Sequence, residues 1–75
     1  MEEVERKYFE DVKWGLNNYF NLMKRYPDKW VAVVNKKIVS SGESIEKVEL
    51  EAEKKSGKDK RNIPVIFVER GAHIY

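Results

Sequence analysis

A run of β-forming residues near the middle of the chain constrains its fold more than any other feature. Residues 30–34 read Trp-Val-Ala-Val-Val, and residues 37–41 read Lys-Ile-Val-Ser-Ser, with only Asn35 and Lys36 between them. Two such runs separated by two residues predict a β-hairpin. Asn35 tolerates the left-handed backbone of a type I′ turn, whereas Lys36 is a poorer second residue than glycine. A loop one residue longer, and a register shifted by one or two residues, therefore stay open.

The segment before the hairpin predicts a long helix over residues 3–25. At 100° per residue its hydrophobic side chains fall within about a third of the circumference. Pro27 cannot continue a helix, so we expect the end near Arg25. Trp14 projects roughly opposite this apolar stripe. The predicted stripe is Tyr8, Phe9, Val12, Leu16, Tyr19, Phe20, Met23 and Tyr26.

The segment after the hairpin predicts a second helix and a third strand. Ser44 can cap a helix over residues 45–56, and Gly57 suits the position just past its end. The core side of this helix is Ile45, Val48 and Ala52, with Leu50 projecting elsewhere. Residues 63–68 read Ile-Pro-Val-Ile-Phe-Val, an apolar strand whose early proline favours a sheet edge.

The element order is therefore α-β-β-α-β, and residues 1–75 are expected to form a single α+β domain. A right-handed crossover makes strand 3 parallel to strand 2, and pairing of strand 3 with strand 1 gives a three-stranded sheet of order 2-1-3. Strand 1 is then central, which suits its apolar sequence. We expect two layers, with both helices on one face of the sheet.

Two helices on one face leave the other face of the sheet uncovered. Strand 1 is apolar on both sides, and a monomer seldom exposes such a patch, so we expect a homodimer or a small protein partner to cover it. Alternatively, Trp30 folds over the sheet edge and completes the core of the monomer. The expected interface residues are Trp14, Trp30, Ala32, Val34, Val39 and Leu50.

Composition narrows the function classes. The chain has 75 residues, 41% of them hydrophobic, no cysteine and a net charge of +2, so disulfides and thiolate chemistry are excluded. No apolar stretch is long enough for a membrane span and the N-terminus is acidic, so a cytoplasmic protein is expected. The absence of Gln and Thr beside eleven Lys and ten Glu favours a thermophilic source.

No pattern of residues predicts catalysis. The only histidine, His73, is three residues from the end, and pairs such as Glu46 and Glu49 are typical of a solvated helix face. The glycines form no phosphate-binding cluster. No catalytic residue, metal site, cofactor or small-molecule substrate is therefore expected, and the favoured function is a non-enzymatic, self-associating interaction module.

A basic cluster supports one alternative function, nucleic-acid binding. Cations at the end of a helix also complement its dipole, and the tyrosines of the chain are not interleaved with this cluster. Retention on heparin that weakens steeply with salt would favour this alternative. The cluster consists of Lys54, Lys55, Lys58, Lys60 and Arg61.

The hairpin and its flanks carry a pattern, Tyr26-Pro27-x-x-Trp30-Val31-Ala32-Val33, then Gly42-x-Ser44-x-x-x-Val48 and Ala52 before Gly57. Over residues 15–68 the chain resembles an uncharacterised family of small archaeal and bacterial domains, a domain of unknown function. The resemblance implies the fold and a paired or accessory role, but no activity, cofactor or catalytic residue. Lys36 stands where glycine would be common in that hairpin.

Overall fold

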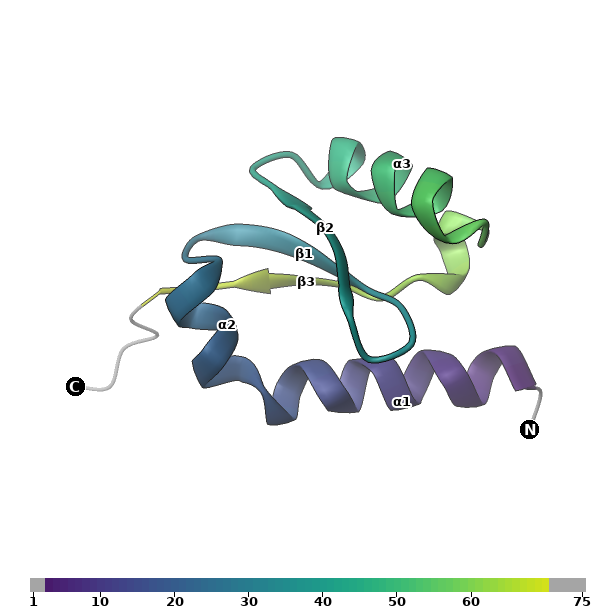
Figure 1. The fold of residues 1–75 in the computed structure, drawn as a ribbon, viewed down its shortest axis with the longest axis horizontal. Helices are drawn as coiled ribbons and strands as arrows, with labels where there is room; N and C mark the ends of the chain where they lie inside the picture. The colour runs from purple at the N-terminus through teal and green to yellow at the C-terminus, as the bar shows by residue number, and fades with distance from the viewer. Residues whose placement is uncertain (1–2, 71–75) are drawn as a thin grey trace.

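A computed structural model describes residues 3–70 of the chain (Figure 1). His73 lies outside the described residues. Each hydrophobic segment of the sequence forms one regular element, apart from the first helical segment, which is divided in two. In order, the elements are α1 (Glu3–Asn17), α2 (Tyr19–Arg25), β1 (Lys29–Val33), β2 (Ile38–Gly42), α3 (Ile45–Ser56), the 3-10 helix η1 (Lys60–Asn62) and β3 (Val65–Val68).

The sheet confirms the predicted α+β class and strand order. Its order is β2-β1-β3, and β1 runs antiparallel to both neighbours, so β2 and β3 are parallel to each other. Val31 pairs with Ser41 on one side and with Ile66 on the other. The β-branched residues of β1 thus occupy the centre, as expected.

The two-layer prediction is wrong, because the helices lie on opposite faces of the sheet (Figure 1). Ala32 of β1 packs with Val48 and Ala52 of α3. Val31, its neighbour along β1, packs instead with Leu22 of α2. A strand that is apolar on both sides is stable only when both sides are covered, and this chain covers them with its own helices. The fold is therefore three-layered.

The long first helix is interrupted at Asn18. The side-chain amide of Asn18 donates to the carbonyl oxygen of Trp14 at 2.8 Å, and the backbone leaves helical geometry there (φ −108°, ψ 17°). Asparagine side chains compete for backbone hydrogen bonds in this way and disfavour helix interiors. The predicted projection of residues 3–25 onto one wheel therefore fails past this point.

The orientation of α1 also differs from the prediction. Gly15 and Asp11 are buried against the sheet, whereas Phe9, Leu16 and Phe20 are exposed. A Cβ on Gly15 would lie 2.5 Å from Ile66 Cδ1, so the missing side chain allows α1 to approach the sheet closely. The second half of the predicted stripe does face the core, where Tyr19, Met23 and Tyr26 pack around Leu22.

The hairpin has a two-residue loop, so the shorter of the two open alternatives is correct. The backbones of Val34 and Lys37 bond to each other in both directions at 2.9 and 3.1 Å, and both Asn35 and Lys36 have positive φ, 53° and 60°. These are the features of a type I′ turn. The expected register shift arises instead from an irregularity beside Ala32 and Val33, which pair with Ser40 and Ile38.

The helix α3 begins and ends as its sequence predicts. The hydroxyl of Ser44 accepts the backbone N–H of Lys47, and Gly57 adopts the left-handed conformation (φ 75°) just past the last turn. Val48 and Ala52 are buried on its inner side. Ser40, buried beneath the helix, donates its hydroxyl hydrogen to the carbonyl oxygen of Val48 at 2.7 Å and ties α3 to β2.

Candidate functional site

The sheet residues predicted to form an interface are inside the protein. Ala32 is fully buried and Val34 nearly so, and the half-buried Trp30 and Val39 pack against the same core cluster. Trp30 also meets Phe67 edge-on, with ring centroids 5.1 Å apart. Those interface assignments are therefore wrong for Ala32 and Val34, because α3 covers the face on which they lie.

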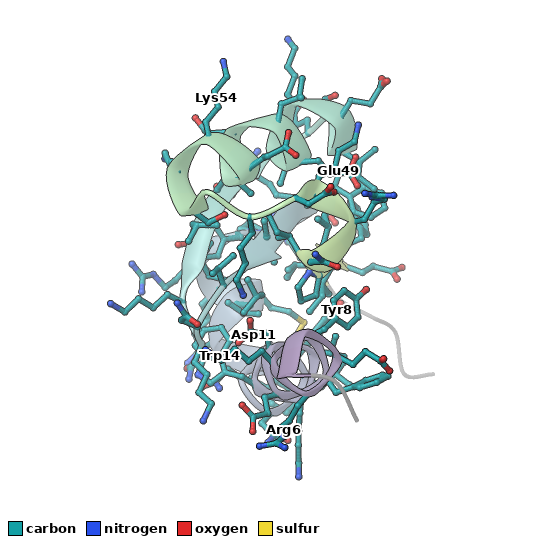
Figure 2. The ribbon with its side chains drawn as sticks, turned by 90° about the vertical axis from the view of Figure 1, so that its right-hand side faces the viewer. Arg6, Tyr8, Asp11, Trp14, Glu49 and Lys54 are labelled. Atoms are coloured by element: carbon teal, nitrogen blue, oxygen red, sulfur yellow. The ribbon has the colours of Figure 1, made fainter. Side chains whose placement is uncertain are left out.

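The two helical residues of the predicted interface have different surroundings. Leu50 is exposed on α3, as expected. Trp14 is half-buried on α1 and lines a pocket between the helices and the hairpin. In Figure 2, Trp14 lies at the flank of α1, Asp11 points toward the sheet and Arg6 points away from it. The prediction that placed Leu16 in the core and Trp14 on the surface is wrong for Leu16, which is more exposed than the half-buried Trp14.

Two of the five cations in the predicted basic cluster at the end of α3 form ion pairs. Lys55 lies 3.9 Å from Glu51, and Arg61 forms a bidentate ion pair with Asp59, its closest contact being 2.9 Å. Hydrogen bonding from Arg61 lowers the pKa of Asp59 to about 2. Carboxylates beside these two cations weaken their attraction for a polyanion, because Lys55 and Arg61 each have a neighbour of opposite charge. Lys54, Lys58 and Lys60 complete this region, with Lys54 pointing away from the sheet (Figure 2).

A row of large hydrophobic side chains runs along the outer side of α1 and α2. Phe9 is 57% exposed, Leu16 60% and Phe20 79%. Isolated exposed hydrophobics are common, but Phe9 and Leu16 lie seven residues apart on the same side of α1, and Phe20 follows on α2 just beyond the interruption at Asn18. We call this set the outer row. Sequence analysis identified its residues but assigned them to the core.

A second surface feature is a pocket of about 630 Å³ between the α1–α2 bend and the hairpin, which we call the hairpin pocket. Four cations line it from two separate elements, Lys24 and Arg25 from α2 and Lys36 and Lys37 from the hairpin. No carboxylate is among the described residues that line it. The remaining lining residues are Trp14, Asn18, Asn21, Leu22, Tyr26 and Ile38.

A buried carboxylate positions the hairpin side of this pocket. Asp11, only 3% exposed, accepts the backbone N–H of Asn35 at 3.1 Å and that of Lys36 at 2.9 Å. The two oxygens thereby satisfy both donors of the turn while both residues hold left-handed backbone. Sequence analysis missed Asp11. No local sequence signal marks this residue, because the turn that it binds lies 24 residues further along the chain.

The described residues contain neither a metal-binding cluster nor a membrane-spanning helix. Over residues 3–70 no group of three or more His, Cys, Asp or Glu side chains is placed to hold a metal ion. In the same part of the chain, no helix has both the length and the hydropathy needed to cross a bilayer.

The fold and its surfaces define a small three-layered α+β domain with a cationic pocket. The model of a family of unknown function, DUF5678, matches residues 21–71, and the chain belongs to this family. The resemblance to an uncharacterised domain family is therefore confirmed, over a segment that starts later than expected. No curated protein and no solved structure matches the chain.

Proposed function

We propose that this domain is a non-enzymatic interaction module that pairs with a second copy of itself through the outer row. The observation that carries this function is the exposure of three large hydrophobic side chains, Phe9 and Leu16 on α1 and Phe20 at the start of α2. The surface differs from the sheet face expected from sequence, since that face is covered by α3.

The energetic reason for pairing is the apolar area that the outer row leaves in water. Fully burying one large hydrophobic side chain contributes about 1.5–3 kcal/mol. A chain of this size also buries a smaller share of its surface than a larger domain does, so a second copy adds to a small core. Two copies of a straight helix such as α1, packed side by side, would bury Phe9 and Leu16 from both.

The charges beside the outer row favour an antiparallel pair of α1 helices. By helical spacing, Glu10 and Lys13 lie on the same side of the row, and both are exposed. In an antiparallel helix pair, each side of one helix meets the same side of the other. Glu10 of each copy would then lie near Lys13 of its partner, giving two equivalent ion pairs that fix the orientation.

Sedimentation equilibrium tests the pairing. The wild-type chain is expected to show a concentration-dependent dimer, and Leu16→Glu is expected to sediment as a monomer because it places a charge in the apolar contact. Leu50→Glu is the matched control: it makes the same change at an exposed leucine of α3 and leaves the dimer intact. A wild-type monomer at high micromolar concentration would refute self-association.

Charge reversal tests the orientation. Lys13→Glu sets like charges against each other and weakens the dimer, whereas the exchange Glu10→Lys with Lys13→Glu restores the pairs and the affinity. If the single and the double variant weaken the dimer equally, the antiparallel arrangement is excluded. Self-association itself is tested separately by Leu16→Glu.

A further inference from the structure

We infer that the hairpin pocket binds a nucleotide unit, with its phosphate on the cations and its base against the aromatic side chains. The ligand is either a free nucleotide or one nucleotide within a single strand, since both present the same phosphate and planar base. The site uses none of the outer-row residues and is separate from the basic cluster at the end of α3.

The charge of the pocket is the first reason. Lys24 and Arg25 occupy the last turn of α2, where cations complement the helix dipole, so their presence there has an ordinary structural explanation. That explanation does not extend to Lys36 and Lys37, which line the same pocket from the hairpin. Among the described residues, the cations that form ion pairs with carboxylates are Lys29, Lys55 and Arg61, none of which lines the pocket. Four cations facing one hollow without such partners favour an anionic ligand.

The backbone of Lys36 is the second reason. Its φ of 60° is the conformation that glycine adopts most readily and that costs another residue about 1–2 kcal/mol. The fold holds it there with the buried carboxylate of Asp11, bonded to the Lys36 N–H at 2.9 Å. Strained backbone maintained by a buried polar contact is characteristic of functional positions. At this strained position the chain carries a lysine rather than glycine, and that lysine lines the pocket.

The aromatic and amide side chains of the pocket complete the match to a nucleotide. Trp14 is half-buried, so one part of its indole packs on the protein while the rest lines the pocket. Tyr26 already carries a planar cation, since Arg25 lies 5.8 Å from its ring centroid. Aromatic rings and guanidinium planes stack with every base, and a volume of about 630 Å³ is in the range of small-ligand sites.

Fluorescence anisotropy with a short labelled single-stranded oligonucleotide at low salt tests this site. The double variant Lys36→Gly with Lys37→Gln is expected to bind at least tenfold more weakly, and the slope of log affinity against log salt is expected to fall by about 0.7 for each lysine removed. Glycine suits the turn, so this variant keeps its fold. Trp14→Leu is expected to weaken binding roughly tenfold through lost stacking.

The matched control is Lys54→Gln with Lys58→Gln, which removes the same charge from the cluster at the end of α3 and leaves binding unchanged. Competition with a nucleoside monophosphate separates the two ligand sources: displacement identifies a single-nucleotide site, and failure to displace identifies a site that needs a strand. Equal weakening by the control, no binding of the wild type at low salt, or displacement by inorganic phosphate as effective as by the nucleotide would each overturn the inference.

Discussion

The two helical layers on either side of the sheet use their side chains differently. In the α3 layer, the buried residues are apolar, Val48 and Ala52, and most of the exposed ones are Glu or Lys, although Leu50 and Ile45, which was predicted to face the core, are also exposed. In the α1–α2 layer the order is partly inverted: Asp11 and Gly15 are buried, while large hydrophobics are exposed. Folding accounts for most of the first pattern but not for the second. Residues whose placement folding does not require are the ones to examine for function.

The family match divides the α1–α2 layer at residue 21. The whole outer row, Phe9, Leu16 and Phe20, precedes the matched segment. The hairpin pocket, by contrast, lies within it apart from Trp14 and Asn18.

The largest expected effect comes from the polar anchor of the α1–α2 layer. Asp11→Ala leaves the N–H groups of Asn35 and Lys36 without their buried acceptor, and hydrogen bonds to a charged group contribute about 1.5–3 kcal/mol each. We expect a loss of about 3 kcal/mol in the free energy of unfolding, measured by urea denaturation.

Asp11→Asn is the control for that change. The asparagine side chain has one carbonyl oxygen and can keep one of the two hydrogen bonds, so this variant should be destabilised less. A loss for Asp11→Ala no larger than for an exposed residue without a proposed contact, such as Glu46→Ala, would mean that the carboxylate of Asp11 does not hold the turn.

The next effect tests the apolar α3 layer. Val48→Ala removes two buried methyl groups from the cluster around Ala32 and should cost about 2 kcal/mol. Because this layer is assigned no binding role, the dimer and the oligonucleotide affinity should be unchanged at temperatures where the variant is folded. A change in either one, with the fold intact by circular dichroism, would show that the layers are not functionally separate.

The same contrast explains which parts of the structure sequence could predict. The strands and the caps of α3 at Ser44 and Gly57 depend on local backbone preferences, which act within a few residues, and they were predicted correctly for that reason. The two-residue turn was one of two open alternatives, favoured by Asn35 and disfavoured by Lys36. The strand order, which pairs Val31 with Ile66, followed instead from connection rules for segments distant in sequence.

The placement of α1 depended on contacts distant in sequence. Gly15 approaches Ile66, and Asp11 reaches a turn 24 residues away, while a periodicity argument weighs only hydrophobicity along one helix. It therefore directed Phe9, Leu16 and Phe20 inward and assumed one continuous helix through Asn18. The hairpin pocket was missed for a related reason: its cations come from two elements whose relative position no local pattern specifies.

A smaller effect of opposite sign is expected at the turn itself. Lys36→Gly removes a side chain from a residue at φ 60°, where glycine has no steric penalty, so the free energy of unfolding should rise by about 0.5–1 kcal/mol. The gain should be measured beside Lys37→Gly, a neighbour that does not have positive φ and should lose stability. Loss of stability in Lys36→Gly would remove the strain argument for this lysine.

The smallest effect belongs to the exposed ion pair beyond α3. Asp59 has a pKa of about 2 because Arg61 bonds to its carboxylate, against an ordinary value of 3.8. A carboxyl group whose pKa is lowered by folding contributes stability above pH 3.8, and that contribution is lost as pH falls from 3.8 toward 2. Asp59→Asn should therefore be slightly less stable than the wild type at neutral pH and equal to it near pH 2. Because the pair is exposed, the difference should shrink in high salt. Thermal unfolding of the wild type and of Asp59→Asn across this pH range measures the difference in stability. A difference that persists below pH 2 would show that the effect does not come from the charge of Asp59.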